Sequence, residues 1–295
     1  MLSRRSLLQL ASLFPLAAAL PAIAGEAPPL KAVASFSILC DMVREIGGGH
    51  VDVTTLVGPN GDAHVYEPTP ADARAGADIL FLNGLDFEAW LPRLVKTAGF
   101  TGREVVVSQG VSPRHFENGS TDPHAWQNLA NGMVYAANIA EGLAKADPAH
   151  AGAYEQNAAG YRGKLKSLDE QVRSAFARIP ESRRKIVTSH DAFGYFGAAY
   201  GVAFIAPNGL STEAEASAAD VARIIDQIRA EKITAVFVEN ITNTKLTDQI
   251  ARETGAKIGG ELYSDALSPP DGDAPTYVRM FEWNLRQLTQ ALGVS

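Results

Sequence analysis

The sequence predicts an α/β protein of two lobes, each with a mostly parallel sheet flanked by helices, joined by one long connecting helix. Three observations lead to this prediction. Short apolar runs alternate with helix-like segments up to residue 145, and the same alternation resumes at residue 185. Between these two regions, residues 148–178 carry apolar side chains at helical spacing and show no strand pattern.

The first lobe is expected to span residues 25–147. Its strands are predicted from short apolar runs, at residues 31–36, 51–57, 78–83 and 104–108. Its helices are predicted at residues 38–46, 88–98 and 128–145. Because strands and helices alternate along the chain, the strands are expected to lie mostly parallel in a sheet that helices cover.

The connecting helix is expected to span residues 148–180. Its apolar positions share one face at helical spacing: Ala151, Tyr154, Ala158, Tyr161, Leu165, Leu168, Val172 and Phe176. Asp147 and Pro148 form a helix start, and Pro180 forms a stop. A helix of this size is roughly 45 Å long, which suits a connector between two lobes better than one layer of a single domain.

The second lobe is expected to span residues 181–295 and to repeat the architecture of the first. Its strands are predicted at residues 185–189, 202–206, 234–239 and 256–259. Its helices are predicted at residues 192–200, 218–231, 245–254 and 276–292. A loop rich in Pro, Asp and Gly precedes the last helix.

The composition narrows the class of protein. The chain has 295 residues, of which 46% are hydrophobic and 20% are charged, as in an ordinary globular protein. The formal net charge of −7 argues against a nucleic-acid partner. Cys40 is the only cysteine, which excludes a disulfide framework within the chain and a cysteine-based structural zinc site. Cys40 itself is expected to be a small buried apolar group.

The N-terminus reads as an export signal. Arg4 and Arg5 precede an apolar stretch over residues 7–20, and a small-x-small pattern ends at Ala24. We therefore expect a cleavable signal peptide over residues 1–24 and a periplasmic protein. The paired arginines resemble a twin-arginine signal, and an ordinary secretory signal is the equal alternative. The position of Cys40, well past the cleavage site, predicts that the protein is not a lipoprotein.

Three of the six histidines follow predicted strands: His64, His124 and His190, of which His190 lies directly at a strand end. In open α/β sheets, ligands bind beyond the carboxyl ends of the strands, so these imidazoles are expected to converge on one cleft. Imidazole is the commonest side-chain metal ligand near neutral pH, which predicts a divalent metal site. The other three histidines are expected to be solvated: His50, His115 and His150.

A closed tetrahedral site needs a fourth donor. Asp265, in the loop beyond the predicted strand 256–259, is one candidate. Glu239, at the end of an apolar strand, is the other. The chemistry of the two carboxylates does not separate them.

Four phrases of the chain, in their order and spacing, resemble the periplasmic zinc- and manganese-binding proteins of ABC importers (cluster A-I, or cluster 9, of the solute-binding proteins). The phrases are DAHVYEP at 62–68, DPHAW at 122–126, TSHDAFGYF at 188–196 and YSDAL at 263–267. The resemblance covers nearly the whole chain after the signal peptide. It implies a two-lobed solute-binding protein, not an enzyme, with a metal ion between the lobes.

The resemblance implies a specific ligand set. It maps the metal ligands onto His64 and His124 of the first lobe and onto His190 and Asp265 of the second. It thereby favours Asp265 over Glu239, which becomes a supporting or structural residue.

The ligand set also bears on the choice of metal. Three nitrogens and one carboxylate favour zinc as the transported ion, because manganese prefers oxygen-rich sites. Manganese remains the alternative. Zinc-binding members of this family often carry a long histidine-rich loop before the second ligand, whereas residues 112–123 are short and hold only His115. An auxiliary metal-capturing loop is therefore not expected.

The implied partners are a divalent metal ion and the membrane permease of an ABC importer, with the protein acting as a monomer. A metallochaperone that loads the protein with metal is a further possible partner. The two rival classes are a zinc hydrolase and an adhesin. A zinc hydrolase, with Glu67 or Asp191 as base, would keep an open coordination position. An adhesin would reuse the scaffold without metal transfer, but the chain has no distinct adhesive module.

Overall fold

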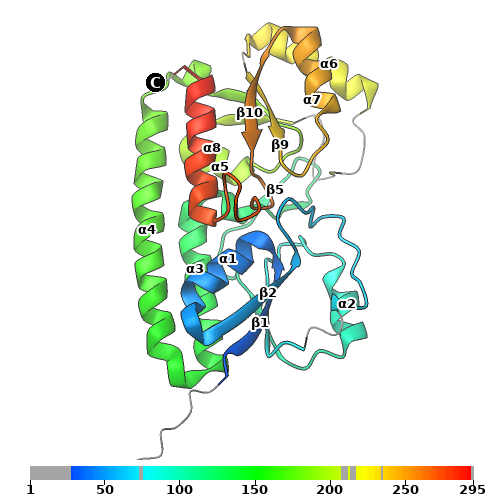
Figure 1. Ribbon diagram of the computed structural model, residues 1–295. Helices are drawn as coiled ribbons and strands as arrows, with labels where there is room; N and C mark the ends of the chain where they lie inside the picture. The colour runs from blue at the N-terminus through cyan, green and yellow to red at the C-terminus, as the bar shows by residue number, and fades with distance from the viewer. Residues whose placement is uncertain (1–27, 73–75, 207–211, 213–216, 234, 294–295) are drawn as a thin grey trace, which may run out of the picture.

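The computed structural model describes residues 28–72, 76–206, 212, 217–233 and 235–293. Two α/β lobes lie one above the other, and a long helix runs beside both of them (Figure 1). This arrangement confirms the predicted fold class. The expected signal peptide, residues 1–24, lies outside the described residues, as does the first residue of the strand predicted at 234–239.

The sheet of the first lobe consists of four parallel strands in the order β2-β1-β3-β4. The strands are β1 (Leu30–Phe36), β2 (Val51–Val57), β3 (Ile79–Leu82) and β4 (Arg103–Val106). Because β1 pairs with a neighbour on each side, its residues are buried from position 32 onward. The alternation of strands and helices in the sequence therefore gives a parallel sheet, as predicted.

Helices cover both faces of this sheet: α1 (Ser37–Gly47), α2 (Leu91–Ala98) and α3 (Leu129–Ala146). Successive side chains of a strand point to opposite faces. Ala34 and Phe36 of β1 accordingly join the core that includes α1 and α3, whereas Val33 packs in a separate apolar cluster with α2. Figure 1 shows α2 on the side of the lobe away from α3.

The connecting helix is α4 (Ala151–Ala177), and a 3-10 turn over Pro148–His150 leads into it. Its 27 residues make it about 40 Å long. Its buried side chains include seven of the eight predicted apolar positions: Tyr154, Ala158, Tyr161, Leu165, Leu168, Val172 and Phe176. The helix packs on α1 and α3 of the first lobe and on α5 and α8 of the second.

The sheet of the second lobe is also parallel, in the order β10-β9-β7-β8. Its strands are β7 (Lys185–Val187), β8 (Ala203–Ile205), β9 (Ala235–Glu239) and β10 (Lys257–Leu262). Its helices are α5 (Gly194–Tyr200), α6 (Ala218–Glu231), α7 (Lys245–Thr254) and α8 (Tyr277–Ala291). Helices α6 and α7 share one apolar cluster, while α5 and α8 belong to the core that continues through α4 into the first lobe.

Two local features differ from the sequence prediction. The helix expected at 88–98 begins only at Leu91, because the buried carboxylate of Glu88 accepts hydrogen bonds from the backbone amides of Asn83 and Gly84. The segment 112–123 contains a two-stranded antiparallel hairpin, β5 (Arg114–His115) and β6 (Thr121–Asp122), where only a loop was expected. Within the described ranges, every helix is too short or too polar to cross a membrane.

Candidate metal centre

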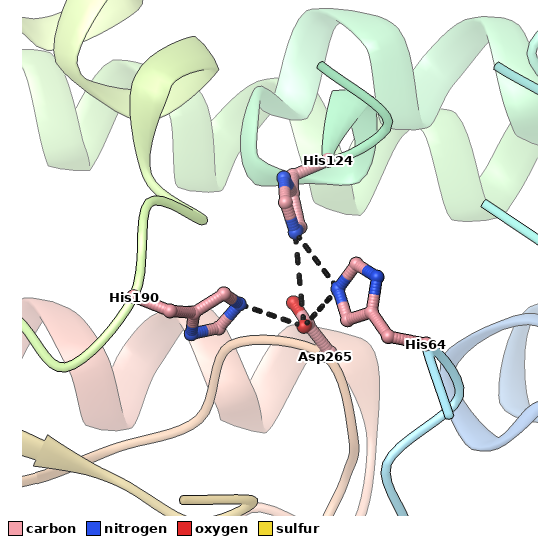
Figure 2. A group of neighbouring side chains, drawn as sticks. All are labelled: His64, His124, His190 and Asp265. Atoms are coloured by element: carbon pink, nitrogen blue, oxygen red, sulfur yellow. Dashed lines mark hydrogen bonds and ion pairs between the residues drawn. The ribbon is translucent and has the colours of Figure 1, made fainter. Parts of the chain in front are cut away.

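Four side chains from four loops meet between the two lobes. His64 follows β2, His124 follows β6, His190 follows β7, and Asp265 follows β10. One donor atom from each lies within 4.8 Å of the donor atoms of the other three. Figure 2 shows the three imidazoles arranged around the Asp265 carboxylate. The structure thus brings together the four residues that the sequence analysis singled out.

The distances between these donor atoms are short. Oδ2 of Asp265 lies 3.1 Å from Nε2 of His64 and 3.0 Å from Nε2 of His190. The same oxygen lies 3.7 Å from Nε2 of His124, and the Nε2 atoms of His64 and His124 are 3.3 Å apart. All three imidazoles therefore present the same ring nitrogen to the centre.

The group is almost completely withdrawn from solvent. The side chains of His124, His190 and Asp265 are fully buried, and that of His64 is 9% exposed. The ring of Phe87 meets His64 edge-to-face at 4.8 Å, and Trp126 lies 5.3 Å from the ring of His124. Burial among aromatic rings strengthens every electrostatic interaction within the group.

Two buried carboxylates hold the far side of two imidazoles. Oδ1 of Asp122 lies 2.8 Å from Nδ1 of His124 and also accepts the backbone N–H of His124. Oε2 of Glu239 lies 2.6 Å from Nδ1 of His190. The hydrogen bond to Asp122 at Nδ1 fixes the tautomer and the orientation of the His124 ring, so that its Nε2 faces the centre, while Glu239 is an ion-pair partner at Nδ1 of His190.

Glu239 therefore takes a different place from Asp265. Its Oε1 accepts the backbone N–H groups of Ser189 and His190, both at 2.9 Å. It stands behind His190 and is not one of the four converging side chains. Both carboxylates that the sequence analysis considered thus contact His190, one at each ring nitrogen.

The loop that carries Asp265 is held by the first lobe. The carbonyl of Ser264 accepts hydrogen bonds from Nε1 of Trp126 and Nε2 of Gln127, two and three residues after His124. The hydroxyl of Ser37, at the start of α1, accepts the backbone N–H of Leu267. These contacts between lobes place the carboxylate of Asp265 against imidazoles of the first lobe.

The charges within the group shift the pKa values of its members. Burial opposes protonation of His124, but the charge of Asp265 and the hydrogen bond to Asp122 outweigh it and raise the pKa of His124 to about 9. Burial likewise opposes protonation of His190, yet Glu239 and Asp265 raise its pKa well above the ordinary value. Burial would raise the pKa of Asp265, but His124 and His190 hold it well below its usual range. The group is thus a strongly coupled cluster of buried charges.

The remaining candidate residues lie elsewhere. His115 is exposed in the hairpin. The rings of His50 and His150 stack on each other with their centroids 3.9 Å apart, and neither residue belongs to the four-residue group. Cys40 is buried, as expected. Glu67 is exposed and Asp191 is half-buried, and neither belongs to the group.

Sequence reasoning missed the partner of His124. An Asp-x-His spacing occurs twice, at Asp62–His64 and at Asp122–His124. In both cases the aspartate accepts the backbone N–H of the histidine, and only Asp122 also reaches the ring. The spacing signals the local turn in both loops but does not reveal which carboxylate orients its imidazole.

The fold and the buried group between the lobes define a substrate-binding protein of the metal-importing kind. The chain belongs to the family described as zinc-uptake complex component A, periplasmic, whose model matches residues 32–291. It is the substrate-binding component of a metal ABC importer and not an enzyme. The resemblance noted from the sequence is thereby confirmed.

Similar proteins support this assignment. The chain is 35% identical to the metal ABC transporter substrate-binding lipoprotein FimA of Streptococcus parasanguinis over 91% of both chains. It is 33% identical to the manganese ABC transporter substrate-binding lipoprotein PsaA of Streptococcus pneumoniae, over 90% of this chain and 89% of that one. The structure of the periplasmic zinc-binding protein TroA of Treponema pallidum is similar with a TM-score of 0.86, at 30% identity, over 90% of this chain and 99% of the other.

Proposed function

We propose that the protein captures a zinc ion with His64, His124, His190 and Asp265 and delivers it to the permease of an ABC importer. The observation that carries this proposal is the spacing of the four donor atoms. Bonds of about 2.0–2.1 Å in a tetrahedral zinc site put neighbouring ligand atoms about 3.3 Å apart. Four of the six separations run from 3.0 to 3.7 Å around that value, and all six lie within 4.8 Å.

The unpartnered oxygen of the buried Asp265 carboxylate supports a cation at this position. Its Oδ1 is buried and has no hydrogen-bond partner among the described residues. A buried carboxylate oxygen without a donor is costly unless a cation or a water satisfies it. A metal ion bound between the three Nε2 atoms and this carboxylate would satisfy both its charge and its lone pairs.

The donor set favours zinc over manganese. Three imidazole nitrogens and one carboxylate suit zinc, whereas manganese prefers oxygen-rich sites of higher coordination number. The similar proteins are named for both metals, which makes manganese the alternative to test. Because Asp265 closes the fourth position, the site lacks the open position that a catalytic zinc keeps.

We further propose that residues 25–147 and 181–295 are the two lobes and that residues 148–180 are their linker. Export through the signal at residues 1–24 would place the protein in the periplasm as a monomer. The burial of Cys40 in α1 supports a protein without a lipid anchor at that residue.

The test is a competition titration with a chromogenic zinc chelator on metal-free protein, followed by the same titration with manganese. We expect wild type to bind one zinc ion per chain more tightly than manganese, and His190→Ala to bind zinc at least 100-fold more weakly, on the scale of a lost ligand. His115→Ala, at an exposed histidine outside the group, is the matched control and should bind as wild type does. Wild-type zinc affinity in His190→Ala would contradict the proposed site.

A further inference from the structure

A contact between the lobes lies directly behind His124. The side chain of Asp122, which holds Nδ1 and the backbone N–H of His124 through Oδ1, is buried and only 3% exposed. Its second oxygen, Oδ2, faces Gly194 of the second lobe and lies 3.7 Å from Nε of Arg114, which is in the same hairpin as Asp122. The orientation of the His124 ring thus depends on where this one carboxylate sits.

The second lobe fixes the backbone of the same segment. The hydroxyl of Tyr195 donates to the carbonyl of Asp122 at 3.2 Å and accepts the backbone N–H of Arg114 at 2.8 Å. The guanidinium of Arg114 lies over the ring of Tyr195 at 5.7 Å. The hairpin that leads to His124 is therefore seated on the first turn of α5, which begins four residues after His190.

Gly194, the first residue of α5, lets the Asp122 carboxylate approach the backbone of α5 closely. A Cβ atom at position 194 would lie 2.7 Å from Oδ2 of Asp122 and 3.3 Å from Nε of Arg114. The backbone of Gly194 is not in the positive-φ region, so an alanine could adopt the same conformation. The space that Gly194 leaves open is accordingly the space that the carboxylate occupies.

We propose that Asp122 is the positioning residue for His124 and that Gly194 of the opposite lobe permits that position, so that the second lobe acts on a ligand of the first. This inference rests on the proposed metal function of His124. An added methyl group at position 194 must push the carboxylate away, which turns or frees the imidazole and misdirects its Nε2. Loss of a partner behind a ligating histidine costs about 10- to 100-fold in metal affinity.

The test is a double-mutant cycle on the zinc dissociation constant of the full-length chain, measured by chelator competition. The four proteins are wild type, Gly194→Ala, Asp122→Ala and the double variant. Gly163→Ala is the matched control, since a Cβ there meets open space on α4. Thermal unfolding of each variant confirms that it is folded, and Asp122→Ser takes the place of Asp122→Ala if the alanine variant unfolds.

We expect Asp122→Ala to weaken zinc binding by about 10- to 100-fold and Gly194→Ala to weaken it by up to the same factor. The double variant should bind like Asp122→Ala, because the methyl group then has no carboxylate to displace. The slowly exchanging Nδ1 proton of His124, seen by nitrogen-15 NMR of the zinc-loaded protein, should vanish in Asp122→Ala and shift in Gly194→Ala. Gly163→Ala should leave both readouts unchanged.

Two results would overturn the inference. Zinc binding by Gly194→Ala within twofold of wild type would show that the contact does not matter, and effects that multiply in the double variant would show that Gly194 acts by another route. The proposed function fails in a different way. In that case His124→Ala, which removes the ligand itself, would bind zinc as wild type does.

Discussion

Asp41 is a buried carboxylate at the junction of the lobes, and its ionisation should limit the stability of the protein. It lies on α1 of the first lobe, is 4% exposed, and accepts the backbone N–H of Tyr277 at the start of α8. Burial raises the pKa of Asp41 to about 6, although the hydrogen bond from Tyr277 opposes the shift. The perturbation that tests this is Asp41→Asn, which keeps a side-chain acceptor for Tyr277 and removes the charge.

The sign and size of the effect follow from linkage. Because the folded-state pKa of Asp41 lies above the ordinary value of 3.8, the folded protein holds this proton more tightly than the unfolded chain. The stabilisation from that proton is full below about pH 4 and is lost as the pH rises through about 6. The difference between this pKa of about 6 and the ordinary value of 3.8 corresponds to at most about 3 kcal/mol of folding free energy. The advantage of Asp41→Asn over wild type should therefore grow by up to that amount between pH 4 and pH 7.

Urea unfolding of metal-free protein, followed by circular dichroism across this pH range, measures the difference. Glu155→Gln is the control, because Glu155 is an exposed carboxylate on α4 that is not among the charges acting on Asp41, and its removal should change stability by less than about 0.5 kcal/mol. A difference between Asp41→Asn and wild type that stays constant from pH 4 to pH 7 would refute the reasoning.

Three further outcomes are expected. Glu239→Gln should weaken zinc binding by about 10- to 100-fold in chelator competition, because the carboxylate at Nδ1 of His190 is lost, and unchanged affinity would contradict its supporting role. Gly132→Ala should lower the free energy of unfolding in urea by about 1–3 kcal/mol, since its Cβ would lie 2.7 Å from the hydroxyl of Tyr277, and a neutral result would argue against that tight packing. The pKa of His124 near 9 means that zinc must displace a proton at neutral pH. Calorimetric affinity should then rise at least about tenfold per pH unit from pH 6 to pH 8, and a plateau above pH 7 would contradict this.

The parallel sheets and the connecting helix were predictable because their signals are local. Apolar spacing alone placed the buried face of α4, and the positions of His64 and His190 after strands placed them at the carboxyl ends of the two parallel sheets, whereas His124 follows the hairpin strand β6. The hairpin β5–β6 was missed because each of its strands has two residues in a polar segment, too few for any alternation to appear. The start of α2 was misplaced because the Glu88 side chain serves the preceding loop.

The choice between Asp265 and Glu239 could not come from chemistry alone. Glu239 ends β9 and Asp265 follows β10, and both carboxylates contact His190. Only the three-dimensional arrangement puts Asp265 at Nε2 beside two other imidazoles and Glu239 at Nδ1 behind the ring. The stacking of His50 on His150 was invisible for the same reason, since these residues are far apart in the chain.

The apolar interior that runs from α1 through α4 to α8 means that neither half of this molecule is a portable module. A fragment that contains α4 and only one lobe would leave the part of the helix's apolar stripe that packs on the other lobe facing water. Hybrids that join one half of this chain to the other half of a relative must therefore match side chains along the entire helix before any change in metal preference can be attributed to the ligands.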